Sequence, residues 1–294
     1  MGVGEDFRTL DSNLAVSSGV RGTISNRYGL ITRRLNLEFW NIESHDYHSV
    51  YTGSYGRGSA IGDTSDVDMI FWLPYARYTQ YDAHSGNGQS AMLQDVRAAI
   101  KKTYSVTNVG ADGQVVVVPF DDGITFEVLP AFLNKDDSFT FPDSNGGGSW
   151  RTTNPRPEIA EISAMDKACN YNLKALCKMG RAWKQTWDVP ISGLLIDTLA
   201  YYFIRDYKYR EKSYVYFDYM SRDFFDYLRA QDENKQYWLS PGANQYVWRV
   251  GRFEWKATRC KNIAEEACAY QGDNYGWTAR QKWREIYGTN FPNS

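Results

Sequence analysis

The sequence is poor in the residues that build metal–thiolate centres and catalytic imidazoles, with four cysteines and three histidines among 294 residues. None of the cysteines forms a Cys-x-x-Cys pair, so a zinc site is not expected. Buried free thiols of a cytosolic protein are the simplest expectation. The cysteines are Cys169, Cys177, Cys260 and Cys268. The histidines show neither triad nor metal-ligand spacing, so structural or surface roles are expected for His45, His48 and His84.

Long apolar runs and an excess of either charge are also missing. No stretch approaches the roughly 20 apolar residues that span a bilayer, and the first residues lack the basic start and apolar centre of a signal peptide. A cytoplasmic protein that does not bind membranes is therefore expected. The formal net charge of −2 gives no dominant basic field of the kind that grips a long nucleic acid. The charge therefore favours small ligands over a nucleic-acid polymer.

The first half of the chain alternates helical and strand patterns. Apolar residues at helical spacing predict a leading helix over 21–40. A strand over 66–73, stopped by a proline, is followed by a polar loop and a helix near 89–104. The β-branched run at 114–120 and its return at 124–129 flank an Asp-Asp-Gly turn, which predicts a hairpin. Helices packed against a mainly hairpin-linked sheet are therefore expected.

A glycine-rich break near residue 146 and an Asn-Pro-Arg-Pro segment mark a change of character, after which helical patterns dominate. The expected helices cover about 158–187, 192–210, 214–231, 250–271 and 276–287. We therefore expect two lobes separated by a cleft, an α/β catalytic lobe over 1–150 and an α-helical lobe over 151–294.

The most informative motif is a Gly-Ser turn followed by a pair of carboxylates. Gly53-Ser54 precedes Asp66-Val67-Asp68 by eleven residues, and the aspartates open an apolar run. Small residues let a backbone approach a phosphate closely. Alternate residues of a strand face the same way, so Asp66 and Asp68 can share hard cations. The combination predicts a metal-dependent nucleotidyltransferase.

A third acidic residue strengthens that prediction. Glu127 alternates with apolar residues in the strand over 124–129, where a buried acid is costly unless a cation or hydrogen bonds compensate. The alternative is a glutamate on the wet face of an exposed hairpin. Two-metal phosphoryl transfer uses about three carboxylates, so a metal role for Glu127 is favoured.

Several other residues are candidates for nucleotide contacts. Tyr55 is the best-placed ring for base stacking, and Arg57 pairs with a phosphate or caps the turn. Lys178 and Arg181, three residues apart, share a helix face and would hold a triphosphate if that face lines the cleft; facing outward they would form a solvated stripe. Ser192 stands where a helix begins, as an N-cap, and an exposed helix start also offers donors to phosphate.

These segments together resemble the polymerase-β-like nucleotidyltransferases. Within them the chain resembles the bacterial CD-NTases, the oligonucleotide cyclases of CBASS antiphage defence, which are related to animal cyclic GMP–AMP synthase. The superfamily motifs are Gly53-Ser54, Asp66-Val67-Asp68 and Phe126-Glu127-Val128-Leu129-Pro130-Ala131-Phe132. The narrower resemblance rests on the leading helix, Gly-Ser-Tyr-Gly-Arg-Gly, Asn154-Pro155-Arg156-Pro157, Arg181-Ala182-Trp183-Lys184 and the final Lys282–Gly288 segment.

The resemblance implies an α+β fold in which a polymerase-β-like lobe with a mixed sheet and a helical C-terminal lobe form a two-lobed cage. It implies Mg²⁺, with Mn²⁺ as an alternative, held by the catalytic residues Asp66, Asp68 and Glu127. Many relatives carry Asp where Glu127 stands. Nucleotide binding is expected at Gly53 and Ser54 and near Tyr55, and the resemblance adds donor-phosphate contacts from Lys178, Arg181 and Ser192. No counterpart of the animal enzyme's zinc insertion is present, which argues against long DNA as an activator.

The expected activity is synthesis of a cyclic dinucleotide or short cyclic oligonucleotide from nucleoside triphosphates, with release of pyrophosphate. ATP with a second NTP, or ATP alone, would be the substrate, and a downstream effector would read the product. A monomer is expected. The alternatives are transfer of a single nucleotide to a small molecule or protein, and a catalytically inactive nucleotide-binding regulator.

Overall fold

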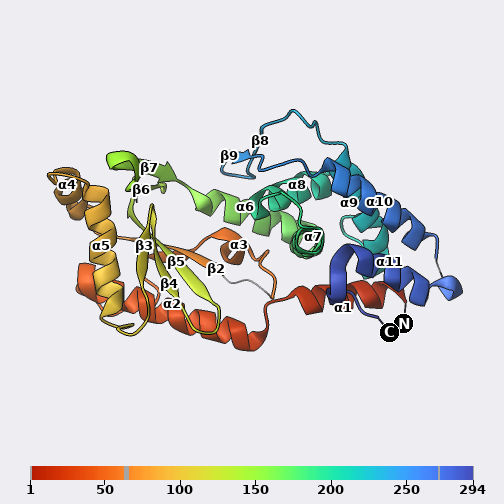
Figure 1. Ribbon diagram of the computed structural model, residues 1–294, viewed down its shortest axis with the longest axis horizontal. Helices are drawn as coiled ribbons and strands as arrows, with labels where there is room; N and C mark the ends of the chain where they lie inside the picture. The colour runs from red at the N-terminus through yellow and green to blue at the C-terminus, as the bar shows by residue number, and fades with distance from the viewer. Residues whose placement is uncertain (1, 63–65, 271, 294) are drawn as a thin grey trace. The chain divides into compact units, whose positions relative to one another are not determined.

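The computed structural model describes residues 2–62, 66–270 and 272–293 and divides into two compact units (Figure 1). The helical unit comprises Met1–Ala15, Arg57–Gly62 and Pro157–Ser294. The sheet unit comprises Val16–Gly56 and Asp63–Arg156. The last boundary between the two units lies after Arg156, near the predicted division after residue 150. Two earlier segments, Met1–Ala15 and Arg57–Gly62, also belong to the helical unit. Within the described residues, no helix is long and apolar enough to cross a membrane.

Seven strands form the sheet of the sheet unit, in the order β1-β2-β5-β4-β3 with β6 and β7 continuing from β5. Only β2 and β5 pair in parallel, and the other pairs are antiparallel. The strands are β1 (Ser49–Tyr51), β2 (Asp66–Trp72), β3 (Gly110–Asp112), β4 (Val115–Pro119), β5 (Thr125–Leu133), β6 (Phe139–Asp143) and β7 (Ser149–Thr153). The predicted hairpin is confirmed as β4–β5, whose turn places Gly123 at φ +86°. The mixed sheet implied by the resemblance is confirmed, but which strands pair in parallel was not predicted, because a pattern of alternation does not identify a strand's neighbour.

Helices α2 (Ser18–Phe39) and α5 (Gly88–Lys101) contact each other and pack against the sheet, while α4 (Ala76–Asp82) packs on α5 (Figure 1). The predicted leading helix is confirmed as α2, which buries Ile24, Ile31 and Leu35 at helical spacing. Its first turn is capped by Ser17, whose side chain accepts the Val20 N–H at 3.2 Å. A short helix, α3 (Gly53–Arg57), follows β1.

The helical unit is built from seven longer helices among the described residues, and the helix α1 was not predicted. They are α1 (Val3–Leu14), α6 (Pro155–Ala168), α7 (Asn172–Trp187), α8 (Gly193–Arg205), α9 (Phe217–Arg229), α10 (Glu254–Cys268) and α11 (Trp277–Tyr287). The 3₁₀ turns Tyr214–Tyr216 and Gly272–Asn274 precede α9 and α11, and a third, Gly288–Asn290, follows α11. The single helix predicted over 158–187 is wrong. It is split into α6 and α7, because Asn170 and Tyr171 adopt positive φ of 53° and 64°, which no α-helix accommodates.

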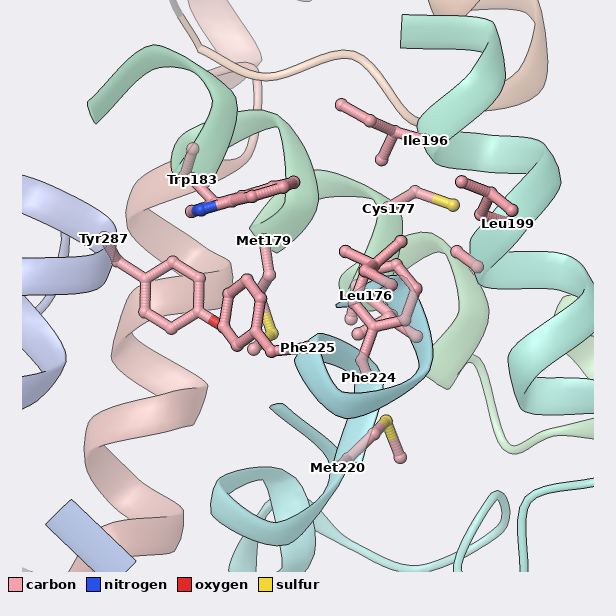
Figure 2. Close-up of a cluster of buried hydrophobic side chains, with 14 of the residues drawn as sticks. Leu176, Cys177, Met179, Trp183, Ile196, Leu199, Met220, Phe224, Phe225 and Tyr287 are labelled. Atoms are coloured by element: carbon pink, nitrogen blue, oxygen red, sulfur yellow. The ribbon is translucent and has the colours of Figure 1, made fainter. Parts of the chain in front are cut away.

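The core of the helical unit gathers large side chains from several helices, as Figure 2 shows. Trp183 of α7 lies 5.3 Å from the ring of Phe225 on α9, which in turn lies 6.4 Å from Tyr287 of α11. Buried aromatic pairs at these distances add to the stabilisation from apolar burial. All four cysteines are free and buried, which confirms the expectation of buried free thiols.

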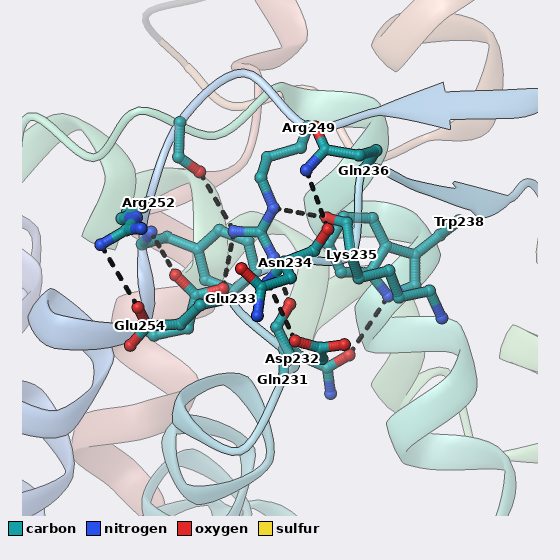
Figure 3. A network of polar contacts seen from close by, with 12 residues as sticks. Gln231, Asp232, Glu233, Asn234, Lys235, Gln236, Trp238, Arg249, Arg252 and Glu254 are labelled. Carbon is teal, nitrogen blue, oxygen red and sulfur yellow. Dashed lines mark hydrogen bonds and ion pairs between the residues drawn. The ribbon is translucent and has the colours of Figure 1, made fainter.

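A two-stranded ribbon, β8 (Tyr237–Leu239) and β9 (Tyr246–Trp248), joins α9 to α10 and was missed in the sequence. Figure 3 shows the polar network that holds its flanks. Arg249 donates to the backbone carbonyls of Asp232 and Lys235 and forms a buried ion pair with Glu254 at 2.6 Å. The short strands escape pattern detection because only Trp238 and Val247 face the core.

Candidate active site

The two aspartates of the Asp-x-Asp motif begin strand β2 and face the same side of the sheet. Val67, between them, is fully buried on the opposite face, whereas Asp66 is exposed and Asp68 half-buried. This alternation follows from the two-residue period of a strand. Asp66 and Asp68 therefore present their carboxylates together on the accessible face.

Strand β5 brings Glu127 beside this pair. Because β2 and β5 are parallel neighbours, Asp68 lies directly opposite Glu127 and Asp66 opposite Thr125. Neighbouring strands are about 4.8 Å apart, so the three carboxylates share one patch of the sheet. Phe126 and Val128, on either side of Glu127, are fully buried on the other face. The structure thus brings Glu127 beside Asp66 and Asp68, although Glu127 lies 59 residues after Asp68 in the sequence.

The electrostatics of Glu127 reflect this crowding. Burial raises the pKa of its carboxyl, and the negative charges of Asp68, Asp66 and Asp112 raise the pKa further. Asp112, at the end of β3, was not singled out in the sequence, since a lone aspartate before Gly113 is indistinguishable from ordinary turn chemistry. The patch of acidic side chains is therefore strongly negative, and a bound cation would reduce the repulsion between its charges.

The acids fit Mg²⁺ in their chemistry. In the chain that the structure describes, no three His, Cys, Asp or Glu side chains are drawn together tightly enough to form a ready-made metal cage. Oxygen donors from one to three carboxylates, with the rest supplied by water and phosphate, are the usual environment of Mg²⁺ at phosphoryl-transfer sites.

The Gly-Ser turn lies against the same carboxylates. Gly53 starts helix α3 at φ +57°, and a Cβ built on it would overlap the carboxylate of Asp68, with the Asp68 Cγ only 2.6 Å away. The backbone N–H of Thr52 donates to the carbonyl of Asp68 at 2.9 Å, and the N–H of Gly56 donates to the carbonyl of Thr52 at 2.8 Å. Only glycine meets both the backbone and the space requirement at this position. The turn that carries Ser54 is therefore fixed directly to the strand that carries Asp68.

Tyr55 packs within the sheet unit. Its ring centroid lies 5.0 Å from that of Tyr51, which stacks on Tyr28 at 3.9 Å. Burial raises the pKa of the Tyr55 hydroxyl. These three rings form an aromatic row beside the Gly-Ser turn, and Tyr55 remains half-buried at its end.

The candidate residues of the helical unit have partners in that unit. The ammonium of Lys178 pairs with Asp11 of α1. The guanidinium of Arg181 pairs with Asp197 at 2.7 Å and donates to the Gly193 carbonyl at 3.1 Å. Neither side chain belongs to a solvated stripe, since both are 14% exposed. Their helix face is therefore buried, and their charges are used in ion pairs.

Ser192 is the N-cap of helix α8, as its position predicted. Its side chain accepts the N–H of Leu195 at 3.2 Å, and its backbone is extended at φ −75° and ψ 151°. The motif satisfies one of the four donors left unpaired at a helix start.

Replacement of Ser192 by Ala is expected to lower the free energy of unfolding by about 1 kcal/mol, because a helix N-cap is lost. Denaturant unfolding of the variant measures this change, and Ser17→Ala, which removes the cap of α2, is the matched control. A loss of activity in Ser192→Ala with no loss of stability would instead indicate a direct contact with substrate.

Comparison with known proteins agrees with this architecture. Residues 1–165 match the family described as the Second Messenger Oligonucleotide or Dinucleotide Synthetase domain. A probable cyclic nucleotide synthase of Bacillus cereus (strain VD146) is 22% identical over 178 residues, which are 57% of this chain. The chain spans about half of that relative, 51% of its length.

Solved structures share the fold at low sequence identity. CdnC of E. coli MS115-1 with ATP has a TM-score of 0.74 and 12% identity, over 99% of both chains. The CD-NTase CdnG of Bradyrhizobium diazoefficiens with GTP has a TM-score of 0.69 and 11% identity, over 97% of this chain and 94% of CdnG. The cyclic AMP-GMP synthase DncV of Vibrio cholerae, with a linear intermediate, has a TM-score of 0.66 and 14% identity, over 83% of this chain and 69% of DncV. The resemblance predicted from the motifs is confirmed: the chain belongs to the Second Messenger Oligonucleotide or Dinucleotide Synthetase family.

Proposed function

We propose that this protein is a Mg²⁺-dependent nucleotidyltransferase that joins nucleoside triphosphates into a cyclic dinucleotide or short cyclic oligonucleotide. The observation that carries the proposal is the alignment of Asp68 opposite Glu127 on parallel strands, with Asp66 on the same face. The Gly-Ser turn packs against Asp68 beside the acids, where it would contact a phosphate of the bound nucleotide. The family match supports the class of product.

In the proposed reaction, Asp66, Asp68 and Glu127 would hold Mg²⁺. When bound there, the ion would supply positive charge to the triphosphate as negative charge develops. The Gly-Ser turn would lie against a phosphate of the bound nucleotide, and the Ser54 hydroxyl would donate a hydrogen bond to that phosphate. These residues would orient the α-phosphate. Such positioning of the reacting groups supplies much of the rate acceleration in phosphoryl transfer.

The bond changes are those of an in-line displacement. A ribose hydroxyl of the acceptor nucleotide forms a bond to the α-phosphorus of the donor, and the bond from that phosphorus to the bridging oxygen of the β-phosphate breaks. Pyrophosphate leaves, and the hydroxyl proton passes to a neighbouring carboxylate. A second displacement of the same kind, using the triphosphate of the linear intermediate, closes the ring.

ATP, alone or with a second NTP, is the proposed substrate. Relatives of the same fold have been solved with ATP, with GTP and with the linear intermediate 5′-pppA(3′,5′)pG. We also propose that the product is a second messenger, read by an effector protein in defence against phage, as the resemblance to CD-NTases implies.

Incubation of the full chain with α-labelled NTPs and Mg²⁺, followed by phosphatase, tests the proposal. A labelled product that resists phosphatase without any added acceptor is expected, because a ring has no terminal phosphate. Product formation only after an acceptor is supplied would indicate transfer of a single nucleotide instead. Absence of both products and of pyrophosphate would indicate a non-catalytic regulator.

Glu127→Gln tests the metal site without measuring turnover. Mg²⁺ is expected to raise the melting temperature of the unaltered protein by about 2 °C or more at saturating concentration, because a ligand that binds only the folded state stabilises it. The shift should be much smaller in Glu127→Gln, which removes one carboxylate. Asp122→Asn, an exposed change on the β4–β5 turn of the same unit, should keep the full shift.

The pH dependence of the same variant provides a second readout. The pKa of Glu127 is raised in the folded state by burial and by the neighbouring aspartates, so its ionised form destabilises the metal-free protein. That destabilisation is absent below the ordinary pKa of glutamate and develops as pH rises through the raised value. Without Mg²⁺, Glu127→Gln should therefore melt above the unaltered protein at pH 7, and the two should converge toward pH 4. Equal melting temperatures at pH 7 would contradict the charge crowding.

A further inference from the structure

The segment that follows the Gly-Ser turn is built into the helical unit. Helix α3 starts at Gly53 and ends at Arg57, and the next residues up to Gly62 group with the helices rather than with the sheet. Arg57 is 6% exposed, Ser59 is fully buried and Ile61 is 5% exposed. The N–H of Gly62 donates to the carbonyl of Leu14 in α1 at 2.8 Å. This stretch is therefore an anchored segment of the helical unit.

A buried cluster of charges holds the anchored segment. Arg57 Nε donates to Asp197 Oδ2 at 2.8 Å, and Arg57 Nη1 donates to Glu158 Oε1 at 2.9 Å. Asp197 Oδ2 also accepts from the hydroxyl of Ser59 and from Arg181 Nη2, both at 2.7 Å. The cluster thus joins the anchored segment to α6, α7 and α8.

The arginines of the cluster favour the charged form of Asp197, its central carboxylate. Burial works against the charged form of Asp197, but the charges of Arg181 and Arg57 outweigh it and lower the pKa of that carboxyl. The side chains of Asp197 and Glu158 are 1% and 6% exposed. Water therefore has little access to solvate either carboxylate if its arginine partner is removed. Removal of one member of such a group leaves the others as uncompensated buried charges.

Arg57 is only three residues from Ser54 and lies in the same short helix. A helix of one turn has almost no stability of its own. The entropy lost when its backbone dihedral angles are fixed exceeds the stabilisation from its single hydrogen bond. Its shape must therefore be imposed at both ends. Gly53 is fixed at one end by its contact with Asp68, and Arg57 is fixed at the other by the charge cluster.

We infer that Arg57 is a positioning residue for nucleotide transfer, which holds the Ser54 turn in place through Asp197 and Glu158. This inference rests on the proposed function and deepens it. Arg57 does not contact the reacting atoms in this role. Arg57 restrains helix α3, whose first residues would receive the phosphate. Asp197 lies 140 residues further along the chain and acts on this helix through Arg57.

The chain offers a matched control for the loss of a buried arginine. Arg249 and Glu254 form an ion pair at 2.6 Å, and their side chains are 7% and 4% exposed. The side chains of Arg57 and Glu158 have similar values of 8% and 6%. Among the residues that the structure describes, the hydrogen bonds of Arg249 go to positions between 232 and 254 (Figure 3). Arg249→Ala should therefore destabilise the helical unit without acting on the Ser54 turn.

The test compares Arg57→Ala, Arg57→Lys and Asp197→Asn with Arg249→Ala in the full chain. Melting is followed by circular dichroism, and kinetics with ATP, GTP and Mg²⁺ are measured at a temperature where every variant is folded. Arg57→Ala and Arg249→Ala should both melt at lower temperature, but only Arg57→Ala should lose kcat/KM, by about a hundredfold. Asp197→Asn should show the same kinetic loss. Arg57→Lys, which keeps the charge but not the two-pronged geometry, should recover stability more than kcat.

Hydrogen exchange of the peptide covering Gly53–Arg57 separates this inference from the proposed function. Exchange at the Gly56 amide should accelerate in Arg57→Ala and stay unchanged in Arg249→Ala. Unchanged exchange in Arg57→Ala, or kinetics per folded molecule equal to those of Arg249→Ala, would overturn the inference. If the unaltered protein yields no nucleotide product, the proposed function fails, while the exchange result still decides whether Arg57 holds the turn.

Discussion

Asp68→Asn is expected to reduce product formation roughly a thousandfold or more while leaving the fold intact. A carboxylate that holds Mg²⁺ contributes several kcal/mol to the stabilisation of charge in the transition state, and each 1.4 kcal/mol corresponds to a factor of ten in rate. Asn has nearly the same shape, so the half-buried position on β2 should accept it. Product formation is measured by chromatography after incubation with NTPs and Mg²⁺, and the fold by circular dichroism.

The stability of this variant should move in the opposite direction from its activity. Among the neighbouring charges, that of Asp68 raises the pKa of Glu127 most. Neutralising Asp68 should therefore reduce the repulsion between these two side chains on the neighbouring strands β2 and β5. Without Mg²⁺, Asp68→Asn should melt at the same temperature as the unaltered protein or above it. Asp122→Asn, whose carboxylate is exposed and pairs with Arg27, should change product formation little. Full activity in Asp68→Asn would contradict the assignment of the site.

Gly53→Ala is expected to lower kcat/KM by about a hundredfold or more. An L-residue at positive φ costs about 1–2 kcal/mol, and the added Cβ would overlap the Asp68 carboxylate. Either the turn or the carboxylate must shift, and a misplacement of about 1 Å at a reacting centre costs roughly a hundredfold in rate. Steady-state kinetics with NTPs and Mg²⁺ measure the effect.

Gly146→Ala is the control that separates backbone strain from the steric clash. Gly146 has φ +61°, nearly the same as Gly53, but nothing lies within 4 Å of a Cβ built there. Both variants carry the cost of an L-residue at positive φ, but Gly53→Ala should lose more stability because of the clash with Asp68, and only Gly53→Ala should lose activity. Equal kinetics in the two variants would show that the contact between Gly53 and Asp68 has no part in the reaction.

The acidic site could be predicted because its signal is local in the sequence. The two-residue spacing of Asp66 and Asp68 fixes their common face, and the apolar neighbours of Glu127 mark it as an unusual acid on a strand. Their proximity could not be derived from the sequence, because it depends on the parallel pairing of β2 with β5. Strand alternation gives a face but does not choose a neighbour.

The helical unit was harder to predict for a different reason. Lys178 and Arg181 were assigned to one helix face, but whether that face meets solvent, substrate or a carboxylate depends on residues far along the chain. Asp11 and Asp197 occupy those positions. Likewise, the break between α6 and α7 relies on Tyr171 at positive φ, a conformation its side chain does not favour. Tertiary packing, not local preference, determines these features.

The most direct test of the account is the mass of the product formed by the full chain from all four NTPs and Mg²⁺ after phosphatase treatment. The expected product is a species whose mass equals a whole number of nucleoside monophosphates, each less one water, with no terminal phosphate. The same species should be absent with Asp68→Asn. A wild-type reaction that gives only linear nucleotides, or a product only with an added acceptor, would contradict cyclic nucleotide synthesis by the site of Asp66, Asp68 and Glu127.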